Sequence, residues 1–208
     1  MRLDAAAVRR ASRHLGRVDP VMARLIGDGG PCRLRLRREG TAFAYLARAI
    51  VAQQISVAAA RSIAGRLGAR FGTPLPPAPV LAASESELRS LGLSRQKATS
   101  LQDLARRTLD GLPLSSLGRR SDEEVIAALT VVKGIGRWTA EMYLMFRLGR
   151  PDVLPVDDLG LRSAMRRAYR MRGLPAPARM RRIAGAWRPH RTVACWYLWQ
   201  SLEMRPPA

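Results

Sequence analysis

The chain has 208 residues and an ordinary hydrophobic fraction, so it can bury a substantial core as one domain or as two small lobes. Its 36 Lys and Arg residues exceed its 16 Asp and Glu residues, which gives a formal net charge of +20. A surplus of this size favours an extended polyanion such as nucleic acid over a small acidic metabolite. An anionic membrane surface is the main competitor, but no basic amphipathic helix with an aromatic apolar face supports it.

The cysteine content and the N-terminus narrow the class of protein further. Cys32 and Cys195 are too few for a disulfide framework, a four-thiolate zinc site or an iron–sulfur cluster. We expect two reduced thiols, and a single disulfide between them is the alternative. The first residues, Met1-Arg2-Leu3-Asp4, lack the apolar stretch of a signal peptide, and no apolar run approaches transmembrane length. We expect a cytoplasmic protein, monomeric, without a metal, a required cofactor or a membrane partner.

Helix-start residues and apolar residues at helical spacing recur along the whole chain. They predict helices over residues 4–15, 20–26, 43–71, 84–91, 94 to beyond 104, 121–131, 137–148, 158–170 and 193–203. The longest of these has a small and polar middle at 52–56, which predicts two helices that meet there. Residues 34–37 alternate briefly and are interpreted as a strand or an extended link, and 72–79 as a proline-rich connector. With no strand-rich region and no repeat, the predicted fold class is all-α.

The densest signal lies between the helix predicted to end at Val131 and the helix predicted to begin at Arg137. This turn is Val132-Lys133-Gly134-Ile135-Gly136. Its glycines permit backbone conformations that other residues avoid, and they remove side chains that would block a ligand. Ile135 can fill the angle between the two helices, while the amides of the turn face outward as an anion site for a DNA phosphate. An ordinary turn between two helices is the alternative for the Gly-x-Gly pattern alone.

The wider pattern resembles a known family. With Thr139-Ala140 behind it, the turn is similar to the helix-hairpin-helix motif, and Leu154-Pro155-Val156-Asp157-Asp158-Leu159-Gly160 follows farther along. The combination resembles the helix-hairpin-helix DNA glycosylases of the endonuclease III superfamily. It is most similar to the bacterial 3-methyladenine DNA glycosylase II branch, as are the segments 48–56 and 91–98 and Trp187-Arg188-Pro189 leading to Trp199.

The resemblance covers about residues 43–202 and implies an architecture. We expect two all-α lobes with an active-site cleft between them. One lobe would comprise residues 42–150 and carry the hairpin, and the other would comprise residues 1–41 together with 151–208. The best-known bacterial member has an additional N-terminal β-rich domain, so this chain resembles a compact form of the branch.

The resemblance also implies a catalytic aspartate. Counted from Trp138, the family's catalytic aspartate corresponds to Asp158. If the chain is aligned instead on the Val-Asp sequence of the bifunctional relatives, the catalytic aspartate corresponds to Asp157. Either aspartate can cap the helix that follows, and this role is compatible with catalysis because the helix field favours an ionised carboxylate. A glycosylase needs such an anion beside the deoxyribose to stabilise oxocarbenium-like charge and to orient the attacking water.

The base pocket is expected to contain Trp138, Met142 and Trp199. Bifunctional relatives have a nucleophilic Lys at the position of Trp138, so a Trp there implies a water nucleophile and no strand cleavage; core packing is the alternative for this side chain. Trp199 matches a pocket Trp whose electron-rich face attracts a cationic alkylated purine, and core packing is the preferred interpretation of Trp196. Met142 matches a position that is Tyr in better-known members, which leaves the preferred lesion open.

A target base must leave the duplex before its glycosidic bond can be reached, and a wedge residue usually fills the gap. By position Gln54 is the wedge, with Gln53 and Ser56 beside it at the DNA backbone; a helix-terminal hydrogen-bond role is the alternative for the glutamines. The other predicted DNA-binding residues are Lys133, Gly134, Ile135, Gly136, Thr139, Arg95 and Lys97. Solvated charge is the alternative for Arg95 and Lys97. Relatives often hold a monovalent cation at the hairpin carbonyls.

These inferences predict a monofunctional DNA glycosylase that excises alkylated bases of the 3-methyladenine or 7-methylguanine type from double-stranded DNA. A non-catalytic helix-hairpin-helix DNA-binding protein is the first alternative, and the presence of Asp158 and the tryptophans argues against it. A glycosylase for deaminated bases such as hypoxanthine, or for oxidised bases, is the second alternative. A catalytic Lys or a cluster of four cysteines would favour oxidised bases, and neither is found.

Overall fold

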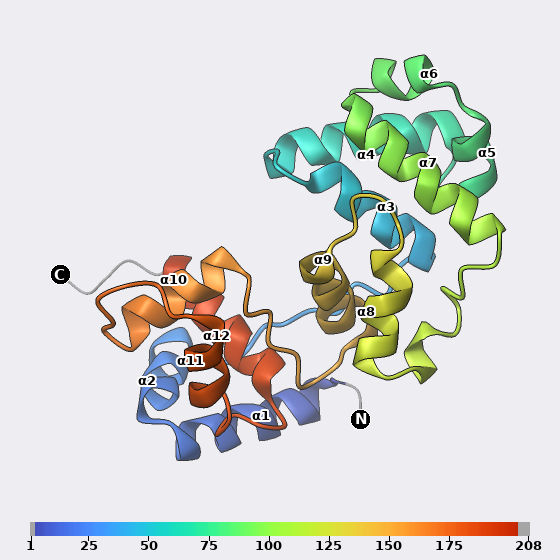
Figure 1. Cartoon of the computed structure of the whole chain (residues 1–208). Coiled ribbons are helices and arrows are strands. Elements are labelled where there is room, and N and C mark those ends of the chain that lie inside the picture. The colour runs from blue at the N-terminus through green and yellow to red at the C-terminus, as the bar shows by residue number, and fades with distance from the viewer. Residues whose placement is uncertain (1–2, 204–208) are drawn as a thin grey trace. The chain divides into compact units, whose positions relative to one another are not determined.

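The computed structural model describes residues 3–203, and within this range the chain is helical with connecting turns and no strand (Figure 1). The predicted all-α class is confirmed. The chain divides into two compact units: a central unit, Arg38–Tyr143, and a terminal unit, Met1–Arg37 with Leu144–Ala208. The lobe boundaries predicted at 42 and 150 stay predictions. Residues 1–2 and 204–208 of the predicted terminal lobe lie outside the described residues.

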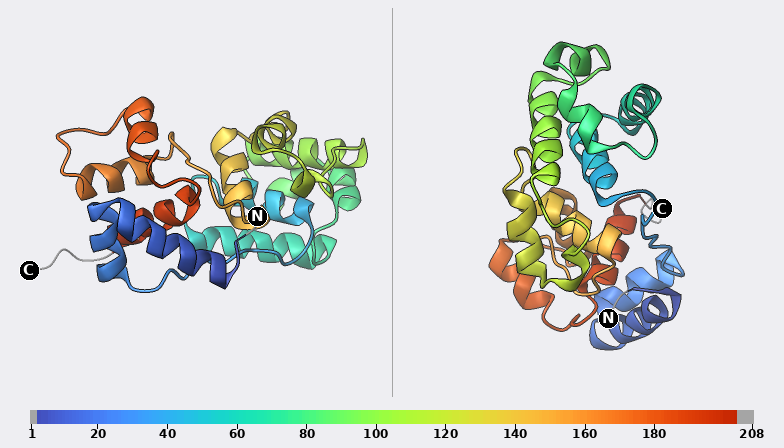
Figure 2. Two further views of the ribbon diagram at one scale, coloured as in Figure 1. Left: turned by 90° about the horizontal axis from the view of Figure 1, so that it is seen from below. Right: turned by 90° about the vertical axis from the view of Figure 1, so that its right-hand side faces the viewer.

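The central unit is built around one long helix. Its helices are α3 (Ala42–Ala52), α4 (Val57–Phe71), α5 (Pro77–Ala82), α6 (Glu85–Ser90), α7 (Arg95–Leu109), the 3-10 turn η1 (Leu117–Arg119), α8 (Asp122–Thr130) and α9 (Arg137–Met142). Helix α7 packs against α3, α5 and α6, as Figures 1 and 2 show. Its apolar side chains Leu101 and Leu104 are fully buried. Because α7 contacts several neighbours, it can hold the loops between them in place.

Local capping signals explain where the helices of the central unit begin. Ser121 and Glu124 form the predicted capping box at α8, and the Ser94 hydroxyl accepts a hydrogen bond from Lys97 N at α7. The predicted interruption of 43–71 is confirmed, because α3 ends at Ala52 and Ser56 caps α4. These residues satisfy amides that would otherwise lack a partner at the start of each helix.

The terminal unit combines helices from both ends of the chain: α1 (Ala5–Val18), α2 (Pro20–Gly29), α10 (Leu159–Ala168), α11 (Pro177–Ile183) and α12 (Arg191–Glu203). Helices α1 and α2 lie side by side in Figure 2, and α12 packs against α1, α2 and α10. Asp4 caps α1 as predicted. The Trp187 side chain is fully buried in this unit. The packing of α10 against α12 brings together residues that are far apart in the sequence.

Some short elements differ from the sequence-based expectation. The segment predicted to be a proline-rich connector contains helix α5, and helix α11 was not predicted. Both helices begin with Pro. Proline lacks a backbone N–H, which costs nothing in the first turn of a helix because the amides there have no hydrogen-bond partner within the helix. Residues 34–37 form an extended link rather than a strand. The predicted helix 137–148 is α9 followed by a π-helical turn, η2 (Tyr143–Leu148). The last helix begins at Arg191 rather than Val193.

Cys32 and Cys195 are free thiols, as predicted. Burial raises the pKa of the Cys32 thiol to about 11. No helix within residues 3–203 is both long enough and apolar enough to cross a membrane. Within the same range, no group of three or more His, Cys, Asp or Glu side chains could hold a metal ion.

Candidate functional site

The predicted hairpin of the central unit lies between the end of α8 at Thr130 and the start of α9 at Arg137. Gly134 has a φ angle of +78°, in the left-handed region that favours glycine. An added Cβ at this position would lie 2.5 Å from the Ser100 hydroxyl oxygen of α7. Ile135 is buried, as its predicted place between the two helices requires. The turn therefore needs glycine at position 134 for two separate reasons.

Two polar side chains from other elements hold this hairpin. The Asp103 carboxylate of α7 accepts a hydrogen bond of 2.8 Å from Lys133 N, and the Gln53 side-chain amide donates one of 2.9 Å to the Gly134 carbonyl. Burial alone would raise the pKa of Asp103, but the hydrogen bond from Lys133 N and the Arg107 guanidinium hold this pKa below its usual value. The expectation that every turn amide faces outward is wrong for Lys133, whose amide is bonded to Asp103.

The two glycines of the hairpin provide a matched pair of substitutions. Gly134→Ala should lower the free energy of unfolding by about 2–4 kcal/mol, because it adds left-handed strain and a clash with Ser100. Gly136→Ala should cost less than about 1 kcal/mol, since φ is −89° at Gly136 and nothing lies within 4 Å of the added Cβ. Urea unfolding and the affinity for duplex DNA measure both effects. Equal losses in the two variants would show that the positive φ and the Ser100 contact are unimportant.

Three of the residues predicted to bind DNA contact protein groups in this structure. Besides Gln53, the Lys97 ammonium donates a 2.7 Å hydrogen bond to the Val51 carbonyl near the end of α3, and Arg95 forms a 3.0 Å ion pair with Glu85. Desolvation lowers the pKa of Lys97. For Gln53 and Lys97 these bonds join the α3–α4 turn, α7 and the hairpin into one framework. The helix-terminal alternative considered for Gln53 thus has a geometric basis.

The α3–α4 turn itself is exposed and strained. Gln54 has a φ angle of +56°, which is unusual for a residue with a side chain. Residues Ile55 and Val57 beside it are 38% and 77% exposed, although both are apolar. Ser56 caps α4 by accepting a hydrogen bond from Ala59 N. Strained backbone of this kind is concentrated at functional sites. The sequence analysis did not single out the exposed apolar pair.

Helix α9 presents Trp138 near its start and Met142 one turn later. Trp138 is 44% exposed, so the alternative that it packs in the core is wrong. Met142 is half-buried and Thr139 is buried. Arg137 fixes the start of the helix through ion pairs with Glu123 at 2.6 Å and Glu141 at 3.2 Å. These contacts raise the pKa of Arg137 and lower that of Glu123, chiefly through their mutual hydrogen bond.

The two candidate catalytic aspartates of the terminal unit differ in their surroundings. Asp158 is half-buried and is the N-cap of α10, where its Oδ1 accepts a 2.5 Å hydrogen bond from Leu161 N. The same Oδ1 accepts a 2.9 Å hydrogen bond from the indole Nε1 of Trp199 on α12. Asp157 is exposed. The structure therefore holds the Asp158 carboxylate at a defined place, next to one of the predicted pocket tryptophans.

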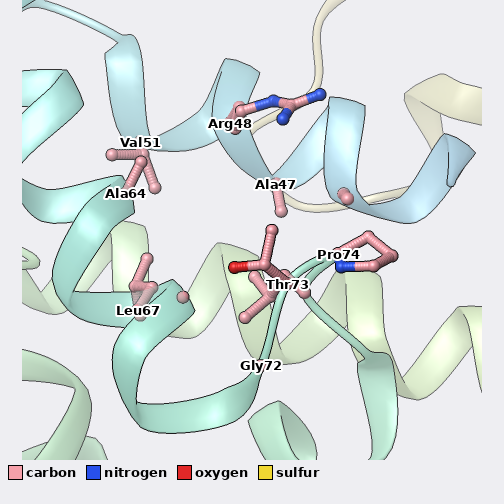
Figure 3. A pocket seen from close by; sticks show the side chains of 11 residues that line it. Ala47, Arg48, Val51, Ala64, Leu67, Gly72, Thr73 and Pro74 are labelled. Atoms are coloured by element: carbon pink, nitrogen blue, oxygen red, sulfur yellow. The ribbon is translucent and has the colours of Figure 1, made fainter. Parts of the chain in front are cut away.

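A cavity of about 100 Å³ in the central unit lies elsewhere, between α3, α4 and the segment 72–75. Figure 3 shows Ala47, Val51, Leu67 and Thr73 around it and the Arg48 guanidinium at its edge. The lining is mostly small and apolar. None of the predicted site residues lines this cavity, so it gives no support to a base pocket there.

Together these features define a class: an all-helical protein with a glycine hairpin suited to a phosphate backbone, an exposed tryptophan and a carboxylate at a helix N-terminus. The sequence model described as "HhH-GPD superfamily base excision DNA repair protein" matches residues 47–189. The chain belongs to this family. The family confirms the resemblance inferred from the hairpin and the loop that precedes α10.

Curated relatives and solved structures are similar over most of the chain. DNA-3-methyladenine glycosylase 1 of Schizosaccharomyces pombe is 35% identical over 88% of this chain and 81% of its own length. The alkylbase DNA glycosidase-like protein mag2 of the same yeast is 31% identical over 92% of both chains. The S. pombe 3-methyladenine DNA glycosylase Mag1, solved in complex with abasic DNA, has a TM-score of 0.81 at 33% identity and covers 94% of this chain and 97% of its own.

A DNA-3-methyladenine glycosidase from Bacillus halodurans also has a TM-score of 0.81 at 33% identity, with 92% of this chain and 88% of its own covered. An 8-oxoguanine glycosylase/lyase from Clostridium acetobutylicum has a TM-score of 0.76 at 18% identity. That second likeness shows a shared fold alone.

Proposed function

We propose that the protein is a monofunctional DNA glycosylase that removes alkylated bases from double-stranded DNA by hydrolysis of the N-glycosidic bond. The observation that carries this proposal is the Asp158 carboxylate, which is held at the N-terminus of α10 by Leu161 N and Trp199 Nε1. Two solved structures with the same fold and about one third identity are named 3-methyladenine DNA glycosylase and DNA-3-methyladenine glycosidase, and the first of them was solved with abasic DNA. The family membership supports a role in base excision repair.

The hairpin supplies the contact with the DNA backbone in this proposal. The amides of Gly134 and Gly136 donate no hydrogen bond to other residues within 3–203, so they are available for a phosphate oxygen. Such contacts place the protein on a duplex without reading its sequence. A monovalent cation at this turn stays a prediction; two of the turn's carbonyls, those of Val132 and Gly134, already accept hydrogen bonds from Ile135 N and Gln53.

The chemistry follows from the residues present. Alkylation of a purine ring nitrogen weakens the glycosidic bond, so the leaving base needs little protonation by the enzyme. Asp158 would stabilise the positive charge that develops on the deoxyribose and orient the attacking water. The exposed Trp138 carries no amine that could form a Schiff base with the sugar, which supports a water nucleophile and no strand cleavage. Gln54 on its strained turn is the proposed wedge.

The direct test is base release from methylated duplex DNA, with released bases identified by mass spectrometry. We expect the wild-type protein to release 3-methyladenine or 7-methylguanine and to leave alkali-labile abasic sites without cutting the strand. Unmethylated duplex is the control, and a duplex with a single hypoxanthine tests the deaminated-base alternative. Binding of the duplex without release of any base would leave the non-catalytic DNA-binding protein as the remaining interpretation.

A further inference from the structure

The Asp158 carboxylate is held by donors from two different helices. Oδ1 accepts hydrogen bonds from two donors at once, Leu161 N at 2.5 Å and Trp199 Nε1 at 2.9 Å. The first donor belongs to the helix that Asp158 caps, and any N-cap aspartate has such a bond. The second donor comes from α12, which packs against α10. The cap alone therefore does not account for the way this carboxylate is held.

The indole of Trp199 is itself fixed in place. Its ring lies 6.1 Å from the Phe146 ring, centroid to centroid, with an interplanar angle of 34°. On the other side, Gly160 leaves the room that the bond requires. An added Cβ at Gly160 would lie 3.2 Å from the Asp158 Oδ1 and 3.5 Å from Trp199 Cδ1. Gly160 and Phe146 thus leave the indole N–H in reach of the carboxylate.

We propose that Trp199 is a positioning residue for Asp158, acting through its indole N–H. This inference rests on the proposed glycosylase function. Two donors on Oδ1 fix the side-chain rotamer and so set where the negative charge of the carboxylate lies. A carboxylate that stabilises an oxocarbenium-like sugar must be placed within a fraction of an ångström, and a displacement of about 1 Å can cost about a hundredfold in rate. The role that the sequence predicted for Trp199 was that of a pocket side chain whose electron-rich face attracts a cationic purine.

Two substitutions separate the N–H donor from the aromatic surface. Trp199→Phe keeps a six-membered ring but has no donor. Trp199→His loses the six-membered ring, but its Nε2 stands two bonds from Cγ, as the indole Nε1 does, and can carry the proton. A pH of about 9 favours the neutral imidazole, because its ordinary pKa is about 6.5 and a neighbouring carboxylate raises that value by about one to two units. Trp199→Phe therefore keeps the six-membered ring without the donor, whereas Trp199→His keeps the donor without the six-membered ring.

The readout is single-turnover base release from a methylated duplex at saturating enzyme, together with the dissociation constant for the same DNA. We expect Trp199→Phe to slow the chemical step by about tenfold to a hundredfold, the usual effect of losing a hydrogen bond to a charged group. Its affinity for DNA should change less than about threefold, and Trp199→His should recover most of the rate. A rate for Trp199→Phe within about twofold of wild type would overturn the proposal, as would equal losses in the two variants.

A second measurement does not depend on catalysis. The indole N–H of Trp199 should give a downfield-shifted cross-peak in a ¹H–¹⁵N spectrum, assigned by its loss in Trp199→Phe. Asp158→Ala should move this cross-peak and leave that of Trp187, which donates to Asp19 at 2.9 Å, unchanged. If the Trp199 cross-peak does not move, the hydrogen bond is absent in solution and the proposal fails. If the wild-type protein releases no base, the proposed function fails, whereas this spectrum still reports on the positioning contact.

Discussion

Asp158→Asn should reduce the single-turnover rate of base release by about 10²- to 10³-fold, which is the usual loss when a preorganised charge-stabilising group is removed. The Asn side-chain oxygen can still accept the hydrogen bonds from Leu161 N and Trp199 Nε1 that Asp158 Oδ1 accepts now. Asn is also as good an N-cap as Asp. The variant should therefore fold with an unchanged melting temperature and bind methylated duplex DNA as tightly as wild type, while it loses the negative charge.

The matched control for this substitution is Asp157→Asn. Asp157 is exposed and precedes the cap position, so its neutralisation should leave the rate within about threefold of wild type. Quantification of 7-methylguanine released from a uniformly methylated duplex compares the three proteins. An unimpaired Asp158→Asn variant together with an inactive Asp157→Asn variant would move the catalytic assignment to Asp157.

Helix positions were predictable wherever a local signal starts the helix. Ser121 with Glu124, Ser94 and Asp4 each form bonds with amides three residues away, so both partners lie within a short stretch of sequence. The helices α5 and α11 were missed for the opposite reason. Each has at most seven residues, too few to be stable alone, and each depends on burying a single apolar residue, Val80 or Met180, against the rest of its unit.

The candidate site was predictable in residue identity but not in contacts. The spacing between Trp138 and Asp158 identified a carboxylate that the structure places at a helix N-cap. The roles of Gln53 and Lys97 were harder to predict, because their partners, the Gly134 and Val51 carbonyls, are separated from them by 81 and 46 residues in the chain. The identity of a long polar side chain does not reveal whether its partner is a DNA phosphate or a backbone carbonyl. Only the folded arrangement distinguishes the two outcomes.

Asp19 is a buried carboxylate of the terminal unit that the sequence analysis did not single out. It caps α2 through Val21 N at 2.8 Å, and its other oxygen accepts hydrogen bonds from Tyr169 Oη at 2.5 Å and Trp187 Nε1 at 2.9 Å. Asp19 is 8% exposed and Trp187 is fully buried. One carboxylate thus satisfies donors from α2, from the end of α10 and from the segment before α12.

The hydrogen bond between Tyr169 and Asp19 should make the free energy of unfolding depend on pH in the alkaline range. Burial, and then the hydrogen bond to Asp19, raise the pKa of Tyr169. The folded state therefore keeps the Tyr169 proton at pH values where the unfolded chain loses it. This contribution to stability is complete below about pH 10, the ordinary pKa of tyrosine, and is lost as the pH rises above that value.

Asp19→Ala should lower the free energy of unfolding by about 3–5 kcal/mol, because it removes a cap and leaves two buried donors without an acceptor. For a chain of this size that corresponds to a fall in melting temperature of about 10 °C. Asp4→Ala is the matched control: Asp4 is an exposed N-cap whose side chain accepts a hydrogen bond from Ala7 N, so its loss should cost about 1 kcal/mol. Urea unfolding of the two variants measures the difference. If they are destabilised equally, Asp19 acts as a helix cap alone, and the hydrogen bonds to Tyr169 and Trp187 add nothing to the stability of the terminal unit.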